Sequence, residues 1–117
     1  MDFADEFREP NQSIIDPALF AKGLHLHLQE LATLAGVHRA IVSAMPTNSR
    51  LQSYLREAVR TLSSALEVTH DRHRSIYWFR NTPIPEFDYH TAERLVAAGK
   101  TDAVIAYVAS IASGSTG

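Results

Sequence analysis

Six histidines are the residues of this chain most able to do chemistry, and four of them stand in two close pairs. His25 and His27 are two residues apart, so both can face one metal ion only from an extended segment. His70 and His73 are three apart and can share one face of a helix. A zinc site needs three or four ligands, and no cysteine, aspartate or glutamate completes such a set at either pair. We therefore expect no metal and no cofactor.

The sequence also shows no recognisable set of catalytic side chains. Serines such as Ser13 and Ser43 occur without the sharp positioning turn that a nucleophilic serine needs. The chain has no cysteine, which excludes thiol catalysis and a disulfide framework. No acid–base pair or phosphate-binding loop is recognisable either. The sequence therefore predicts a protein that is not an enzyme.

Composition indicates a folded protein with an uneven charge distribution. The 117 residues suit one domain or two small lobes, and 45% of them are hydrophobic. The net charge of -2 combines an acidic segment 1–16, a basic segment 17–75 and a near-neutral segment 76–117. The N-terminus lacks the features of a signal peptide, and no apolar run is long enough to span a membrane. We expect a cytoplasmic location and no membrane partner.

Hydrophobic periodicity predicts an all-α fold. The longest stripe with helical spacing covers residues 49–69 and is expected to form the central helix. Residues 1–16 show no such spacing, so we expect a flexible acidic arm there. A helix-turn-helix-like region follows over 17–74, and a smaller helical region over 75–117. Besides 49–69, the predicted helices are 18–22, 27–34, 38–45, 75–81, 91–98 and 102–113.

Glycines and capping residues predict where these helices begin and end. Gly23 and Gly99 are expected to stop helices, and Asp16 and Thr101 to cap helix starts. The run 70–74 reads as a polar hinge. The alternation of leucine and histidine over 24–28 also fits a strand, but it is short and no partner strand follows it.

The segment around Gly36 has the pattern of a helix-turn-helix. Ala32 is small enough for two helices to approach, and Gly36 permits a left-handed turn. Apolar Val42 would then seat the second helix with its outer face free. Such a face could contact the bases and phosphates of DNA, although helix pairs with a glycine turn are also common structural parts. The candidate DNA-binding residues are His38, Arg39, Ser43 and Arg50.

The C-terminal region has more apolar residues than a solvent-exposed surface usually carries. The run Tyr77–Phe79 consists of three aromatic residues, which point in different directions on a helix. The last helix is apolar around much of its circumference. Because one small chain would struggle to cover this surface and that of helix 49–69, we expect a homodimer or a protein partner.

The segment from Trp78 to Gly114 resembles the toxin-binding domain of the MbcA/ParS/Xre antitoxins, the partners of RES-domain toxins. The resemblance lies in an aromatic-led helix, a proline turn, a short helix ended by glycine, and a last apolar helix that ends in glycine. Upstream, L-Q-E-L-A-T-L-A-G-V-H-R is similar to the helix-turn-helix of Xre proteins, so the likeness extends over residues 19–114. The matching positions are Trp78, Pro83, Phe87, Thr91, Ala92, Leu95, Val96, Gly99, Val104, Val108, Ile111 and Gly114.

This resemblance implies an antitoxin of a type II toxin–antitoxin system. Its partner would be a cognate RES-domain toxin, an enzyme that consumes NAD or transfers ADP-ribose. The antitoxin C-terminus would occupy the toxin's active-site cleft, for which a small glycine-ended tail is suited. The implied toxin-binding residues are Trp78, Lys100, Tyr107, Ile111, Ser113, Gly114, Ser115, Thr116 and Gly117.

Two alternatives remain beside this reading. The chain could be a transcriptional autoregulator that binds its own operator DNA through the helix-turn-helix, with or without a toxin. It could also be a helical protein-interaction module that has no toxin partner. A RES-type gene next to the coding sequence would favour the antitoxin, and its absence would favour the interaction module.

Overall fold

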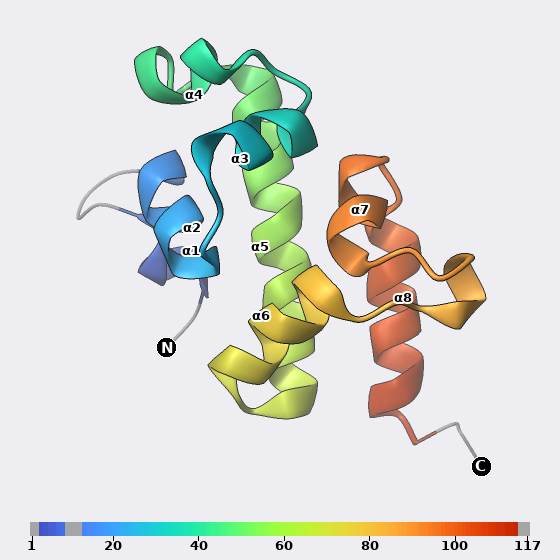
Figure 1. Cartoon of the computed structure of the whole chain (residues 1–117). Coiled ribbons are helices and arrows are strands. Elements are labelled where there is room, and N and C mark those ends of the chain that lie inside the picture. The colour runs from blue at the N-terminus through green and yellow to red at the C-terminus, as the bar shows by residue number, and fades with distance from the viewer. Residues whose placement is uncertain (1–2, 9–12, 115–117) are drawn as a thin grey trace. The chain divides into compact units, whose positions relative to one another are not determined.

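A computed structural model of the chain describes residues 3–8 and 13–114, and these residues form helices without any strand (Figure 1). The all-α class is therefore confirmed. The only sheet-like feature in this part of the chain is an isolated antiparallel bridge between Ile84 and His90. The elements are α1 (Phe3–Glu6), α2 (Pro17–Leu24), α3 (Leu28–Ala35), α4 (Arg39–Ala44), α5 (Ser49–Thr69), α6 (Arg72–Asn81), the 3-10 helix η1 (Pro85–Phe87), α7 (Ala92–Ala97) and α8 (Thr101–Ala112).

The chain divides into two compact units, Met1–Val59 and Arg60–Gly117. The boundary lies inside α5, upstream of the expected boundary between residues 74 and 75. Helix α5 serves both units because its buried side chains continue along most of its length. These buried residues are Leu51, Gln52, Tyr54, Leu55, Ala58, Val59, Thr61, Leu62 and Ala65.

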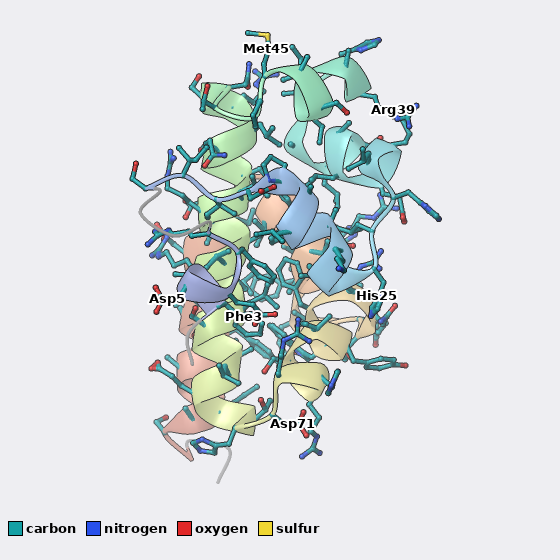
Figure 2. All side chains as sticks on the ribbon, turned by 90° about the vertical axis from the view of Figure 1, so that its left-hand side faces the viewer. Phe3, Asp5, His25, Arg39, Met45 and Asp71 are labelled. Carbon is teal, nitrogen blue, oxygen red and sulfur yellow. The ribbon has the colours of Figure 1, made fainter. Side chains whose placement is uncertain are left out.

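The expectation of a flexible arm over residues 1–16 is wrong for the part that the structure describes. Phe3 and Phe7 are each only 1% exposed, and the single turn of α1 places both on one side. Their ring centroids lie 5.9 Å apart, and the rings of Phe7 and of Phe20 in α2 meet edge to face with centroids 5.3 Å apart. The acidic Asp5 points to solvent (Figure 2). Two phenylalanines four residues apart thus bury one side of a segment that is acidic on the other.

A buried glutamine ties this N-terminal segment to α5. Gln52 is 4% exposed, and its amide oxygen accepts the Ile15 N–H at 3.0 Å. Its amide nitrogen donates to the carbonyl oxygens of Ile15, at 2.7 Å, and of Pro46, at 2.8 Å. One side chain therefore satisfies three main-chain groups where the chain enters α2 and where it enters α5.

Three helices end in the same hydrogen-bonded motif with a left-handed residue. At the end of α3, Gly36 has φ +71° and its N–H bonds to Thr33, while the Val37 N–H bonds to Ala32. The ends of α2 and α7 repeat this arrangement around His25 and Gly99. This is the Schellman motif, in which glycine is favoured because it has no Cβ.

One helix end and two helix starts differ from the sequence expectation. Gly23 does not stop α2, because the helix continues to the buried Leu24 and is capped by His25 with φ +58°. Helix α6 begins at Arg72 rather than 75, since the Asp71 carboxylate caps it through the Arg74 N–H. Thr101 is the buried first residue of α8 rather than its cap.

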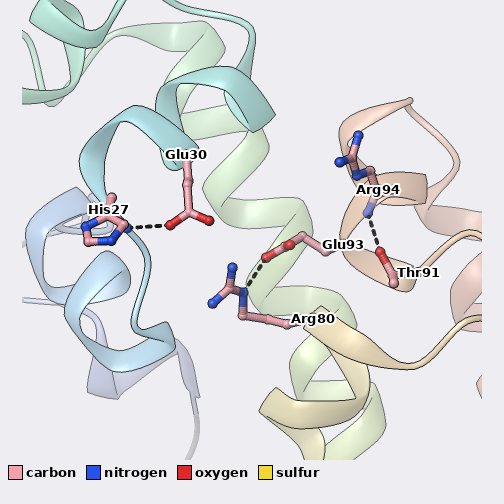
Figure 3. Close-up of polar contacts among 6 residues, drawn as sticks. All are labelled: His27, Glu30, Arg80, Thr91, Glu93 and Arg94. Carbon is pink, nitrogen blue, oxygen red and sulfur yellow. Dashed lines mark hydrogen bonds and ion pairs between the residues drawn. The ribbon is translucent and has the colours of Figure 1, made fainter.

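The second unit has a core of its own, and an ion pair lies largely shielded beside it. Phe79 and Val104 are fully buried, and Ile84 is 1% exposed. Arg80 on α6 bonds through Nε to a Glu93 carboxylate oxygen on α7 at 3.1 Å (Figure 3). Both side chains are largely shielded, at 21% and 10% exposure. Such a pair holds two helices in register because breaking it would strand a buried charge.

Candidate functional site

The predicted helix pair around Gly36 is present, and its geometry rests on local hydrogen bonds. Helices α3 and α4 lie beside the N-terminal end of α5 (Figure 1). Helix α3 begins with half of a capping box, in which Glu30 accepts the His27 N–H at 2.9 Å (Figure 3). Val42 seats α4 at 4% exposure. The second helix has six residues, which makes it short for an element that reads DNA.

The four predicted DNA-binding residues are exposed but do not share one role. His38 caps α4, because its Nδ1 accepts the Ala40 N–H at 3.1 Å. Arg39 and Ser43 are four residues apart on α4 and so share one face. Arg50 donates through one terminal nitrogen to the Gly36 carbonyl at 3.1 Å. That bond braces the turn, and it occupies one of the five donors that the guanidinium offers.

The predicted toxin-binding residues all belong to the second unit, where the structure separates them into half-buried and exposed groups. Trp78 and Tyr107 are half-buried, so each keeps part of its ring in the core. Lys100, Ile111, Ser113 and Gly114 are exposed. Ser115, Thr116 and Gly117 lie outside the described residues.

An aromatic side chain packs on Tyr107, and an acidic one lies near it. The Tyr107 ring meets Phe87 edge to face, with centroids 6.0 Å apart. Burial raises the pKa of the Tyr107 phenol above its ordinary value of 10.0, and the Glu86 carboxylate adds to the rise. The phenol therefore stays neutral at physiological pH and is available as a hydrogen-bond donor.

Helix α8 leaves the packed surface of its unit before it ends. Val104 and Val108 are buried, at 0% and 5% exposure, whereas Ile111 is 41% exposed. Every described residue from Ala109 to Gly114 is exposed. Apart from Ile111, these residues are alanine, serine and glycine. The end of α8 is consequently a narrow rod with one large apolar side chain.

Part of the apolar surface of α8, from which the homodimer was predicted, is already covered by the rest of the chain. Ile105 and Tyr107 are half-buried within the unit, and Ile111 is the one large apolar residue of α8 that is exposed. The homodimer stays a prediction.

Three exposed large side chains were not among the predicted site residues. They are Met45, at 52% exposure, Tyr77, at 66%, and Tyr89, at 70%. Tyr89 follows Asp88 in a tight turn where both residues have positive φ, 64° and 56°, and the His90 N–H bonds to Phe87. This backbone normally favours asparagine and glycine. A turn of non-glycine residues carries no sequence signal of this kind, so inspection of the sequence misses it.

No metal site or membrane-spanning helix emerges from the part of the chain that the structure describes. Within residues 3–8 and 13–114, no three histidine, cysteine or acidic side chains are grouped so as to hold an ion. None of the helices there is long and apolar enough to cross a membrane.

Comparisons with known proteins add no relatives. No family model matches the chain, and neither the curated proteins nor the solved structures include one with significant similarity to it.

Proposed function

We propose that this protein is an antitoxin that binds a RES-domain enzyme and blocks its active-site cleft with the C-terminal end of α8. The observation that supports this is the uncovered last part of that helix. Ile111 is 41% exposed, although Val104 and Val108 on the preceding turns are buried. A lone apolar side chain on a narrow exposed rod is a suitable anchor for a pocket in a partner protein.

Side-chain size supports the mode of binding. Ala109, Ser110, Ala112 and Ser113 add little width to the helix, so it can enter a cleft that would exclude larger residues. Gly114 has φ +71° and lets the chain turn away from the helix axis. The body of the unit would then rest against the rim of the cleft, where Lys100 and Tyr107 are candidates for contact.

Co-expression with the RES-type protein encoded next to this chain tests the proposal. The full chain should co-purify with the enzyme and restore growth of cells that produce it. A variant that lacks residues 112–117 should keep its helix content but fail to restore growth. If the shortened variant protects cells fully, the C-terminal end does not block the cleft. If the neighbouring gene is of another type and the chain binds no RES enzyme, the antitoxin assignment fails.

A single substitution makes the test sharper. Ile111→Glu places a charge on the proposed anchor and should weaken binding about a hundredfold, as loss of a buried interface anchor does. Ala106→Glu is the matched control, since it puts the same charge on an exposed position of α8 that faces away from Lys100, Tyr107 and Ile111. Its binding should stay within about threefold of the unchanged chain.

Operator binding is a second candidate because Arg39 and Ser43 are both exposed on one face of α4. Arg39 would contact a guanine edge or a phosphate. Arg39→Ala should weaken binding to the DNA upstream of the coding sequence about tenfold and reduce its salt dependence. A gel-shift titration that finds no sequence preference, and no change in Arg39→Ala, would remove this role.

A further inference from the structure

The first unit contains an open pocket between the starts of α2 and α3 and the end of α4. Its volume is about 490 Å³, which lies within the range of small-molecule sites. Three separate segments of the chain contribute to it. The residues that line it are Ile14, Asp16, Pro17, Ala18, Leu28, Val42, Ser43 and Pro46.

The lining is apolar except for two side chains, Asp16 and Ser43. Asp16 caps α2, and one carboxylate oxygen, Oδ1, accepts both the Ala18 N–H at 2.8 Å and the Leu19 N–H at 3.3 Å. Within the described residues the other oxygen, Oδ2, accepts no hydrogen bond and Asp16 forms no ion pair. The Ser43 hydroxyl likewise bonds to no group there. No lysine or arginine lines the pocket.

This combination selects one class of ligand by charge and shape. A carboxylate without a cation repels an anionic ligand and gains most from an ammonium or guanidinium group. The apolar walls favour a hydrocarbon or aromatic body, whose burial drives binding. A neutral apolar molecule would fill the walls but would cover the carboxylate without pairing it.

We propose that this pocket binds a small organic cation, with its apolar body between Pro17, Leu28 and Val42 and its charged head on Asp16 and Ser43. Binding there does not depend on whether the chain neutralises a toxin. Because Val42 and Ser43 belong to α4, the bound cation would touch the same helix that carries Arg39. A ligand of about ten non-hydrogen atoms would bind with a dissociation constant in about the millimolar range.

An NMR titration of the full chain tests this inference. The probe is 2-phenylethylamine, which is a cation at neutral pH, and 2-phenylethanol is its neutral partner with the same carbon skeleton. The amine should shift the amide signals of Ala18 and Val42 saturably. The alcohol should bind at least about fivefold more weakly than the amine. Equal affinity for the two probes, or shifts that do not include these residues, would overturn the proposal.

Asp16→Asn removes the charge but keeps a good helix cap, so the fold should survive. It should weaken binding of the amine about fivefold and leave the alcohol unchanged. Asp71→Asn is the matched control, because Asp71 caps α6 in the other unit and should have no effect. Ala18→Trp, at an exposed position of the rim, should fill the pocket and abolish binding of both probes. Unchanged amine binding in Asp16→Asn or in Ala18→Trp would contradict the assignment.

Discussion

The two ends of the described chain differ in how their apolar residues are covered. Near the N-terminus, Phe3 and Phe7 are each 1% exposed within the first unit, in a segment with several acidic residues. Near the C-terminus, Ile111 is 41% exposed in the second unit, in a segment without charged residues. Net charge alone would predict the opposite, an exposed acidic N-terminal segment and a buried uncharged C-terminal segment. The spacing of apolar side chains relative to a neighbouring helix decides which end is buried.

This difference bears on function because a covered end stabilises the fold and an uncovered end can bind. The phenylalanines at the first end connect through Phe20 to Tyr54, with ring centroids 6.5 Å apart in the last step. Among the residues that the structure describes, no comparable set of side chains covers α8 beyond Val108. If the comparison is right, substitutions at the first end lower stability, and substitutions at the second end change binding alone.

The largest expected effect is at the buried first end. Phe7→Ala should lower the free energy of unfolding by about 3–5 kcal/mol, since it removes a ring that contacts both Phe3 and Phe20. Urea denaturation followed by circular dichroism measures this. A loss below about 1 kcal/mol would mean that the N-terminal segment is only loosely attached.

The hydrogen bonds of Gln52 should contribute the next largest effect. Gln52→Ala leaves the Ile15 N–H and two carbonyl oxygens without their partner, which should cost about 2–3 kcal/mol. Gln52→Glu is an informative companion, because it keeps the acceptor for Ile15 but loses both donated bonds. Hydrogen exchange at the Ile15 amide should become much faster in Gln52→Ala and less so in Gln52→Glu, which keeps its acceptor. Protection at the native level in Gln52→Ala would contradict the anchoring role.

At one strained helix end, a substitution is expected to raise the stability of the fold rather than lower it. His25 has φ +58° at the end of α2, a conformation that costs a side chain more than it costs glycine. His25→Gly should therefore raise stability by about 0.5–1 kcal/mol. Gly36→Ala is the matched opposite, because Gly36 has φ +71° at the end of α3. This substitution should lower the free energy of unfolding by about 1 kcal/mol. Thermal unfolding of the two variants should move in opposite directions.

The smallest effect on stability is expected at the uncovered end. Ile111→Ser removes a side chain that is 41% exposed and should change the free energy of unfolding by less than about 0.5 kcal/mol. Its affinity for the proposed RES-domain partner should nevertheless fall at least tenfold. A stability loss above about 1.5 kcal/mol would show that Ile111 belongs to the core of its unit and would remove the contrast between the two ends.

Helix positions follow from the sequence where periodicity and breakers agree. The stripe over residues 49–69 coincides with α5, and Gly36 and Gly99 end α3 and α7 as expected. Gly23 misled the prediction because burial of Leu24 carried α2 past it, so that tertiary packing outweighed the glycine signal. The phenylalanines at 3 and 7 were overlooked because one helical turn is too short to show periodicity.

The candidate sites were only partly accessible from the sequence. Arg39 and Ser43 are exposed, as expected for the free face of the second helix. The brace from Arg50 to the Gly36 carbonyl was not expected, because it joins residues 14 positions apart. The pocket beside Asp16 was not predicted either, since Ile14, Leu28 and Pro46 meet only when the chain has folded.

Inhibition of the proposed RES-domain partner by purified protein tests the central claim most directly. The NAD-consuming or ADP-ribosylating activity of that enzyme would be titrated with the full chain, with the variant lacking residues 112–117, and with Ala106→Glu. The full chain and Ala106→Glu should inhibit the enzyme at a one-to-one ratio of sites. The shortened variant should bind weakly or not at all and leave the enzyme active. Equal inhibition by the shortened variant would contradict the account.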